Sequence, residues 1–151
     1  SGICDVQKMS NMGINLAVGT DGPSSNNALD MFREMYLISV LQKLKYNDAA
    51  AMDANEILKA ATSGSAKCMG LTDCDCIAEG KLADLMIIDL ERPNMQPINN
   101  ITKNLVYSGS KDDVKMTMIN GKILYENGEF VNIDKEEIYA KAQEICNRLK
   151  N

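Results

Sequence analysis

The sequence predicts an α/β fold in which a buried strand and several helices come first, and an antiparallel meander and a last helix follow. Three patterns indicate this order. Residues 14–20 are apolar with small residues between the larger ones, which is typical of a strand covered on both faces. Helical spacing of apolar residues then continues to about residue 70. From residue 114, apolar residues alternate with polar ones, as in a half-buried strand.

The first helices are predicted from their ends and their periodicity. Residues 5–12 form a short helix that ends at Gly13, because glycine readily adopts the left-handed conformation that follows a helix. After the strand, a long helix is expected from a cap at Asn26 or Asn27 to about Lys45. Its apolar stripe is broad, which indicates burial on two sides.

Two shorter helical segments are expected next. Asp53 with Glu56 has the pattern of a capping box, which predicts a helix through about Thr62. A second segment begins at Ser65 and closes at Gly70. Beyond this point the period changes from that of helices to that of strands.

The second half of the chain predicts a sheet and a closing helix. Residues 84–89 are a continuous apolar strand. The pairs at 120–121 and 127–128 are both Asn-Gly, a strong hairpin signal because both positions tolerate positive φ, and they predict a three-strand meander. Asp134 with Glu137 repeats the capping-box pattern and predicts a terminal helix.

Charge and composition exclude several classes of protein. The formal net charge is −5, which argues against a nucleic-acid or anionic-membrane surface, because such a surface needs a basic patch. No apolar run approaches the roughly 18 residues needed to span a bilayer. No charged segment with a cleavage site opens the chain, so the cytoplasm is the expected location.

The five cysteines are interpreted as free thiols, since their odd number fits a reducing compartment better than a closed disulfide framework. Cys74 and Cys76 form a Cys-x-Cys pair with Cys68 nearby. A structural zinc site there is the alternative interpretation. Structural zinc takes four ligands, however, and the chain offers no histidine to complete such a set.

The most informative residue is Asp21, which follows the predicted strand and lies between glycines at 19 and 22. In α/β sheets and barrels, ligands bind at the carboxyl ends of strands, so an acid placed there is a candidate for chemistry. Asp-Gly is also a common turn sequence for purely conformational reasons. The local pattern therefore leaves two interpretations, a turn residue or a catalytic acid.

The same stretch resembles a known family. Gly-Thr-Asp-Gly at 19–22, with Ser-Asn-Asn at 25–27 and Leu-Asp-Met at 29–31, resembles the last barrel strand and following loop of the zinc-dependent amidohydrolases. Within them it is most similar to the branch that deaminates 5'-methylthioadenosine and S-adenosylhomocysteine, often described as chlorohydrolase-like. Residues 79–89 resemble the strand that returns to a small β-sandwich after the barrel. The next strands of that β-sandwich have similar sequences in this chain, at residues 104–109, 113–114 and 118–122.

The resemblance implies that the chain is the C-terminal portion of a larger enzyme. Its fold class would be a C-terminal fragment of a (β/α)8 TIM-type barrel, with the last strand and following helices, plus part of a small β-sandwich and a C-terminal helix. These parts would span residues 1–72, 73–133 and 134–151. A full barrel takes about 250 residues, whereas the chain has 151 residues and lacks the histidines of the family's metal site.

The function implied for the full-length parent is metal-dependent hydrolytic deamination of an adenine nucleoside, such as 5'-methylthioadenosine or S-adenosylhomocysteine. Asp21 would bind the metal and take the proton from its water. Ser24, Ser25 and Asn26 would bind the substrate, although capping of the long helix is the alternative role for Asn26 and Asn27. Zinc is the expected cofactor of the parent. We expect this chain alone to bind none and to be inactive.

Two further hypotheses stay open. The same barrel could carry other amidohydrolase chemistry, such as a chlorohydrolase or guanine deaminase reaction, although Ser-Asn-Asn at 25–27 favours the adenosine branch. The chain could also be a non-enzymatic assembly fragment. The expected partners are a small-molecule nucleoside, no nucleic acid and no membrane. A homo-oligomer is predicted as well, because the strand at residues 14–20 would have unpaired edges and the long helix adds exposed apolar surface.

Overall fold

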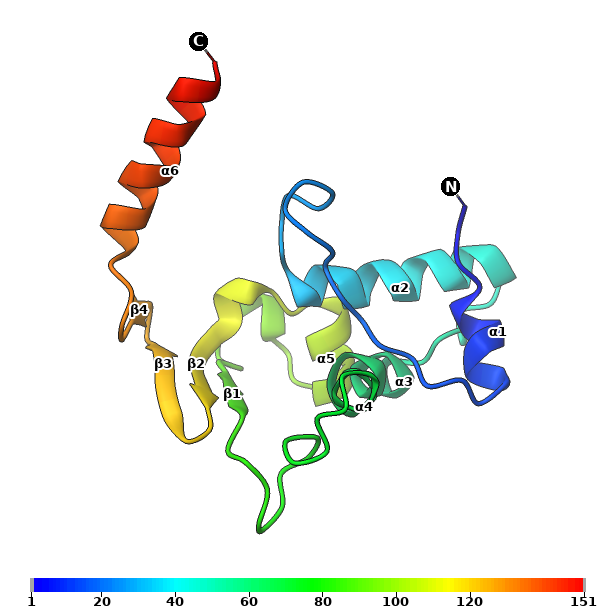
Figure 1. Cartoon of the computed structure of the whole chain (residues 1–151). Helices are drawn as coiled ribbons and strands as arrows, with labels where there is room; N and C mark the ends of the chain where they lie inside the picture. Colours follow the sequence, from blue (N-terminus) through cyan, green and yellow to red (C-terminus); the bar gives the residue numbers. More distant parts are fainter. Residues whose placement is uncertain (1, 151) are drawn as a thin grey trace.

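The computed structural model describes residues 2–150 as a group of helices beside a small sheet, from which the last helix projects (Figure 1). The helices are α1 (Val6–Asn11), α2 (Met31–Tyr46), α3 (Ala54–Lys59), α4 (Ser65–Cys68), α5 (Ile101–Tyr107) and α6 (Lys135–Leu149). A π-helical turn, η1 (Ala60–Gly64), joins α3 to α4. The 3-10 turns η2 (Pro93–Met95) and η3 (Lys111–Asp113) flank α5.

The sheet is antiparallel throughout and follows the order of the chain. Its strands are β1 (Leu85–Ile88), β2 (Val114–Ile119), β3 (Lys122–Glu126) and β4 (Glu129–Phe130). In its register Thr117 lies opposite both Met86 on β1 and Tyr125 on β3. Both Asn-Gly pairs, at 120–121 and 127–128, have positive φ at each position, so the predicted hairpins and meander are confirmed.

The core lies between α2, α3 and α5. Met35 of α2, Ile57 of α3 and Val106 of α5 are each at most 4% exposed and belong to one cluster. Ile88 of β1 and Val114 of β2 pack against this cluster, which joins the sheet to the helices. Full burial of a side chain of this size contributes about 1.5–3 kcal/mol. These contacts therefore fix the position of α2.

The long helix α2 begins later than the sequence predicts. Its N-cap is Asp30, whose Oδ1 accepts hydrogen bonds from the backbone N–H groups of Phe32 at 3.0 Å and Arg33 at 3.4 Å. The predicted caps at 26–27 were wrong, because the chain before Asp30 forms a turn closed on the carbonyl of Gly22. Asparagine is favoured at both turns and caps, and the turn prevails here.

The N-caps predicted at Asp53 and Asp134 are confirmed, although within residues 2–150 neither Glu56 nor Glu137 returns the second bond of a capping box. Asp53 caps α3 by accepting from the N–H of Asn55 at 2.9 Å, and Asp134 caps α6 by accepting from the N–H of Glu137 at 3.0 Å. Helix α3 runs on through η1 into α4. Gly70 then ends this helical stretch with a φ of 71°, which glycine adopts more readily than any other residue.

Residues 14–20 do not form a strand, contrary to the prediction. Within residues 2–150 their backbone pairs with no other strand, because β1 to β4 pair only among themselves. The segment runs across η1 and α4 instead. The side-chain amide of Asn15 donates to the carbonyl of Gly64 at 2.9 Å, and the N–H of Val18 donates to Oγ of Ser65 at 3.2 Å. The apolar pattern marks a packed segment, but a strand also needs a neighbouring strand.

Residues 104–109 are mostly helical, although the resemblance predicts a strand there. Asn100 caps α5 by accepting from the N–H of Lys103 at 2.9 Å. Leu105 and Val106 then meet the core from one side of the helix. The cap and this one-sided burial outweigh the strand propensity of the apolar residues.

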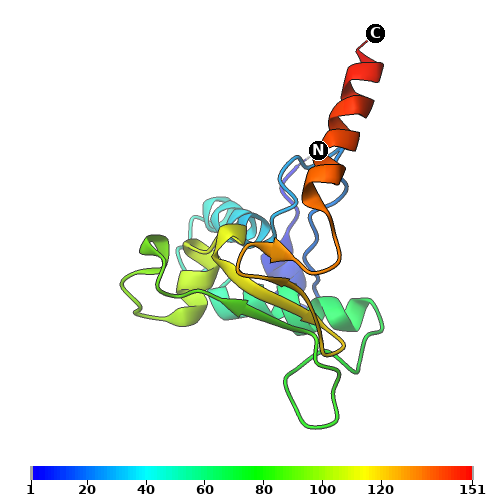
Figure 2. The same ribbon diagram turned by 90° about the vertical axis from the view of Figure 1, so that its left-hand side faces the viewer.

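Helix α6 stands apart from the other helices in Figure 1, and its upper turns project beyond the rest of the chain in Figure 2. None of its described residues is buried, and Ile138, Tyr139 and Ile145 are about half exposed. About half of the surface of these apolar side chains is therefore left uncovered by residues 2–150. Across residues 2–150, every helix is too short or too polar to cross a membrane.

Candidate active site

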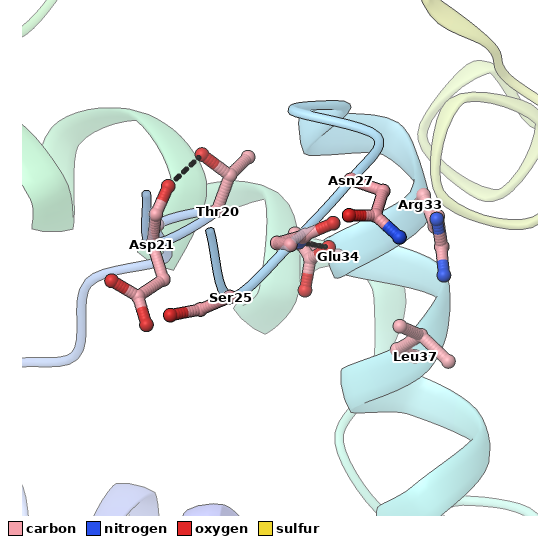
Figure 3. A pocket seen from close by; sticks show the side chains of 9 residues that line it. Thr20, Asp21, Ser25, Asn27, Arg33, Glu34 and Leu37 are labelled. Atoms are coloured by element: carbon pink, nitrogen blue, oxygen red, sulfur yellow. Dashed lines mark hydrogen bonds between the residues drawn. The ribbon is translucent and has the colours of Figure 1, made fainter. Parts of the chain in front are cut away.

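A hollow of about 460 Å³ lies between the loop that precedes α2 and the first turns of that helix (Figure 3). It forms where the sequence predicts a site, directly after residues 14–20. The lining comes from two stretches of chain. The loop contributes Gly19, Thr20, Asp21, Ser25, Asn26 and Asn27, and α2 contributes Arg33, Glu34 and Leu37.

Asp21 adopts a turn conformation and lines the hollow. Its φ is 59°, in the left-handed region that aspartate enters more readily than most residues. Oδ1 accepts the N–H of Gly22 at 2.7 Å, and the Thr20 hydroxyl donates to the Asp21 carbonyl at 3.1 Å. Oδ2 accepts no hydrogen bond from residues 2–150, so it is free for a ligand. The turn interpretation thus describes the backbone of Asp21 and leaves its carboxylate available.

The structure brings three of the sequence-predicted residues to this hollow. Ser25 and Asn26 line it together with Asp21, whereas Ser24 is exposed and lies outside the described lining. Figure 3 shows the Ser25 hydroxyl on the same side of the loop as the Asp21 carboxylate. Asn26 is half-buried, and its side-chain amide donates to Oε1 of Glu34 at 2.6 Å.

Sequence reasoning missed the wall that α2 supplies. Arg33, Glu34 and Leu37 follow the Asp30 cap at helical spacing, so they share the face that meets the loop. That spacing is visible in the sequence. Only the true position of the cap relates the face to the loop, and the predicted cap was too early.

The chemistry of the lining suits a polar small molecule. Hydroxyl, amide, carboxylate and guanidinium groups surround the hollow, with Leu37 as its one large apolar side chain among the described residues. Asp21 can accept a proton from a group that lies within about 2.6–3.2 Å of its free oxygen. The arrangement therefore provides two carboxylates, those of Asp21 and Glu34, and several other groups that can orient a ligand.

The chain does not hold a complete metal site among the residues described. No group of three or more His, Cys, Asp or Glu side chains between residues 2 and 150 is close enough to bind a metal ion. Catalytic zinc takes three protein ligands. Asp21, with its free oxygen, fits the role of one ligand in such a set, and the other ligands would have to come from elsewhere.

The cysteine pair has a different environment. Partial burial raises the pKa of the Cys74 thiol, and a hydrogen bond with Asp84 raises it further. Metals bind the thiolate, so a raised pKa opposes metal binding at neutral pH. Cys76 is exposed, and its neighbour Asp75 pairs with Lys81 at 2.8 Å. This part of the chain behaves as a loop held by an ion pair.

Comparison with known proteins identifies relatives that share this stretch of chain. The model of the amidohydrolase family matches residues 1–124. A 5-methylthioadenosine/S-adenosylhomocysteine deaminase of Pyrococcus furiosus is 44% identical over 93% of this chain, which covers 33% of that protein. The chain spans about a third of the length of the curated relatives it matches.

Two solved structures have the same fold over nearly the whole chain. An adenosine deaminase from Xanthomonas campestris with bound zinc matches with a TM-score of 0.96 and 36% identity, over 99% of this chain and 34% of that one. An atrazine chlorohydrolase from Arthrobacter aurescens, solved with zinc, matches with a TM-score of 0.87 and 26% identity, over 95% and 32% of the two chains. Both structures contain zinc.

Proposed function

The chain belongs to the amidohydrolase family, and from this premise we propose that the whole protein is a metal-dependent hydrolase that deaminates an adenine nucleoside. Its substrate would be 5'-methylthioadenosine or S-adenosylhomocysteine. The observation that carries the proposal is the hollow around Asp21. The residues that line it lie in a stretch 44% identical to a protein named 5-methylthioadenosine/S-adenosylhomocysteine deaminase.

The proposal assigns the chain a place in the parent enzyme. Residues 1–72 would complete a (β/α)8 barrel, 73–133 would form part of a small β-sandwich and 134–151 would be a C-terminal helix. Residues 14–20 would become the last barrel strand once neighbouring strands lie beside them. The unpaired backbone of this segment and the TM-score of 0.96 with a zinc-bound deaminase three times as long support this placement.

Asp21 would have two roles in the reaction. Its free carboxylate oxygen would be one ligand of zinc in the whole enzyme. When bound, zinc lowers the pKa of a water ligand from 15.7 to about 7 and so supplies hydroxide at neutral pH. Asp21 would accept the proton lost by that water and deliver it to the departing ammonia. The exposed, singly hydrogen-bonded carboxylate supports both roles.

The loop residues would bind the substrate. Ser25 and Asn26 line the hollow beside Asp21. The Ser25 hydroxyl is the stronger candidate for a nucleoside contact, because the Asn26 amide is hydrogen-bonded to Glu34 and Ala28. Ser24 was also predicted to bind the substrate, but it is not among the described residues that line the hollow. We therefore assign the nucleoside-binding role to Ser25 before Asn26 and Ser24.

A chlorohydrolase is the second candidate, favoured by one observation. An atrazine chlorohydrolase shares the fold with a TM-score of 0.87, so the same scaffold supports displacement of chloride from a ring. Its identity of 26% is lower than the 36% of the adenosine deaminase, and this difference ranks the deaminase first.

A substrate panel on the full-length enzyme tests the proposal. The zinc-loaded protein would be assayed for ammonia release from methylthioadenosine, adenosylhomocysteine, adenosine and guanine, and for chloride release from atrazine. We expect the highest kcat/KM for an adenine nucleoside, and loss of activity after chelation. Preference for atrazine or guanine, or activity that survives complete zinc removal, would overturn the proposal.

A further inference from the structure

One hydrogen bond joins the two walls of the hollow. Asn26 on the loop donates from Nδ2 to Oε1 of Glu34 on α2 at 2.6 Å, and both side chains are half-buried. The carboxamide oxygen of Asn26 accepts the backbone N–H of Ala28 at 3.1 Å. The amide of Asn26 therefore bonds to the helix on one side and to its own loop on the other. Figure 3 shows Glu34 on the side of α2 that faces the loop.

The loop has few other ties to the helix. The N–H groups of Ser25 and Asn26 donate to the Gly22 carbonyl at 3.0 and 2.9 Å, which closes the loop on itself. Within residues 2–150, no other side-chain hydrogen bond joins residues 22–29 to α2. Besides the Asp30 cap that follows the turn, the Asn26–Glu34 contact is therefore the side-chain hydrogen bond that holds this turn against α2 within residues 2–150.

We propose that Glu34 is a positioning residue for the deamination, because it holds Asn26 and thereby holds against α2 the turn that carries Ser25. This inference rests on the proposed function. A hydrogen bond to an ionised carboxylate is shorter and roughly twice as strong as one between neutral groups. Such a bond suits a task in which a displacement of about 1 Å can cost 10²-fold in rate.

A reversal of the bond provides the test. Asn26→Asp would place two carboxylates at the contact, and their repulsion would open it. Adding Glu34→Gln to that variant would restore the contact, because the glutamine amide can donate to the aspartate. The aspartate keeps an oxygen for the N–H of Ala28. The double variant also has the same net charge as the original pair.

In the full-length zinc enzyme, Asn26→Asp should lower kcat/KM for methylthioadenosine on the order of 10- to 100-fold, the size of a lost hydrogen bond to a charged group. The loss should appear in kcat as well as KM, because the loop carries Ser25 to the reacting centre. Glu34→Gln in the Asn26→Asp background should recover most of it. A double variant as slow as Asn26→Asp alone would overturn the proposal and show that Asn26 acts directly on the substrate.

Hydrogen exchange separates this proposal from the proposed function. Amides of residues 22–29 should exchange faster in Asn26→Asp than in the original enzyme, and the double variant should restore the slower rate. Exchange that is unchanged in Asn26→Asp would overturn the clamp. An original enzyme that is inactive on every nucleoside would overturn the proposed function, while exchange still decides whether Glu34 holds the loop.

Discussion

Gly64 lies directly against the backbone of Leu16, so that a Cβ added at position 64 would be 2.3 Å from the Leu16 carbonyl oxygen. The contact brings η1 against residues 14–20, the segment that leads to Asp21. The amide of Asn15 bonds to the carbonyl of the same glycine at 2.9 Å. The π-helical turn η1 and residues 14–20 therefore pack with their backbones in direct contact.

Gly64→Ala should destabilise the chain by about 1–3 kcal/mol, because the backbone must shift to admit the methyl group. Gly19→Ala is the matched control, since an added Cβ there meets no atom within 4 Å. Urea unfolding followed by circular dichroism measures both variants. Equal midpoints for Gly64→Ala and the unchanged chain would show that η1 can move away from Leu16.

The chain should lose stability in acid. The Tyr46 hydroxyl donates to Asp5 and holds the pKa of that carboxyl below its ordinary value. A hydrogen bond from Lys81 lowers the pKa of the Asp75 carboxyl in the same way. A group with a lowered folded pKa stabilises the fold fully above its unfolded pKa of about 3.9. That contribution is lost as the pH falls through the lower folded pKa.

Thermal midpoints measured below about pH 4 check this expectation. In Asp5→Asn the thermal midpoint should fall less steeply as the pH decreases, because this variant lacks the carboxyl group that would take up a proton. Asp112→Asn, at an exposed aspartate, should leave the decline as it is. If the Asp5 variant declines as steeply as the control, its pairing with Tyr46 contributes nothing in solution.

The isolated 151-residue chain should associate. Its accessible surface is 10588 Å², whereas a compact monomer of this mass exposes about 7,600 Å². The excess of about 3,000 Å² is larger than the area of about 1,000–2,500 Å² that each partner buries in an obligate interface. Light scattering at micromolar concentration should therefore give a mass above that of the monomer. A monodisperse monomer across the whole range would contradict this.

Zinc binding to the isolated chain should not reach one equivalent. Asp21 provides a single ligand, and the raised pKa of Cys74 opposes thiolate formation. Titration calorimetry with zinc should show only weak, non-stoichiometric heat. A tight one-to-one isotherm that Cys74→Ser abolishes would revive the cysteine pair as a metal site.

Local signals in the sequence determined much of the fold. The caps at Asp53 and Asp134 and the hairpins at 120–121 and 127–128 depend on neighbouring residues alone, and the structure confirms each one. The strand predicted at residues 14–20 was wrong for the opposite reason. Whether an apolar segment becomes a strand depends on a partner strand that lies elsewhere in the sequence or outside it.

The candidate site was predicted in part. The glycines around Asp21 and the Ser-Asn-Asn that follows placed the loop correctly, because turn chemistry is local. Glu34 could not be assigned to the site from the sequence. Its place there follows from where α2 begins, and the sequence predicted that start at Asn26 or Asn27, whereas the helix is capped by Asp30. The catalytic role of Asp21 stays a prediction.

The kinetics of Asp21→Asn in the full-length zinc enzyme test the central claim most directly. Asparagine keeps the size of the side chain and removes both the proton acceptor and the anion. Acid–base catalysis alone contributes about 10²- to 10⁴-fold, so deamination of methylthioadenosine should fall by at least 10²-fold, while Asp112→Asn should retain full activity. Near-normal turnover by Asp21→Asn with zinc bound would contradict the account and leave Asp21 as a turn residue only.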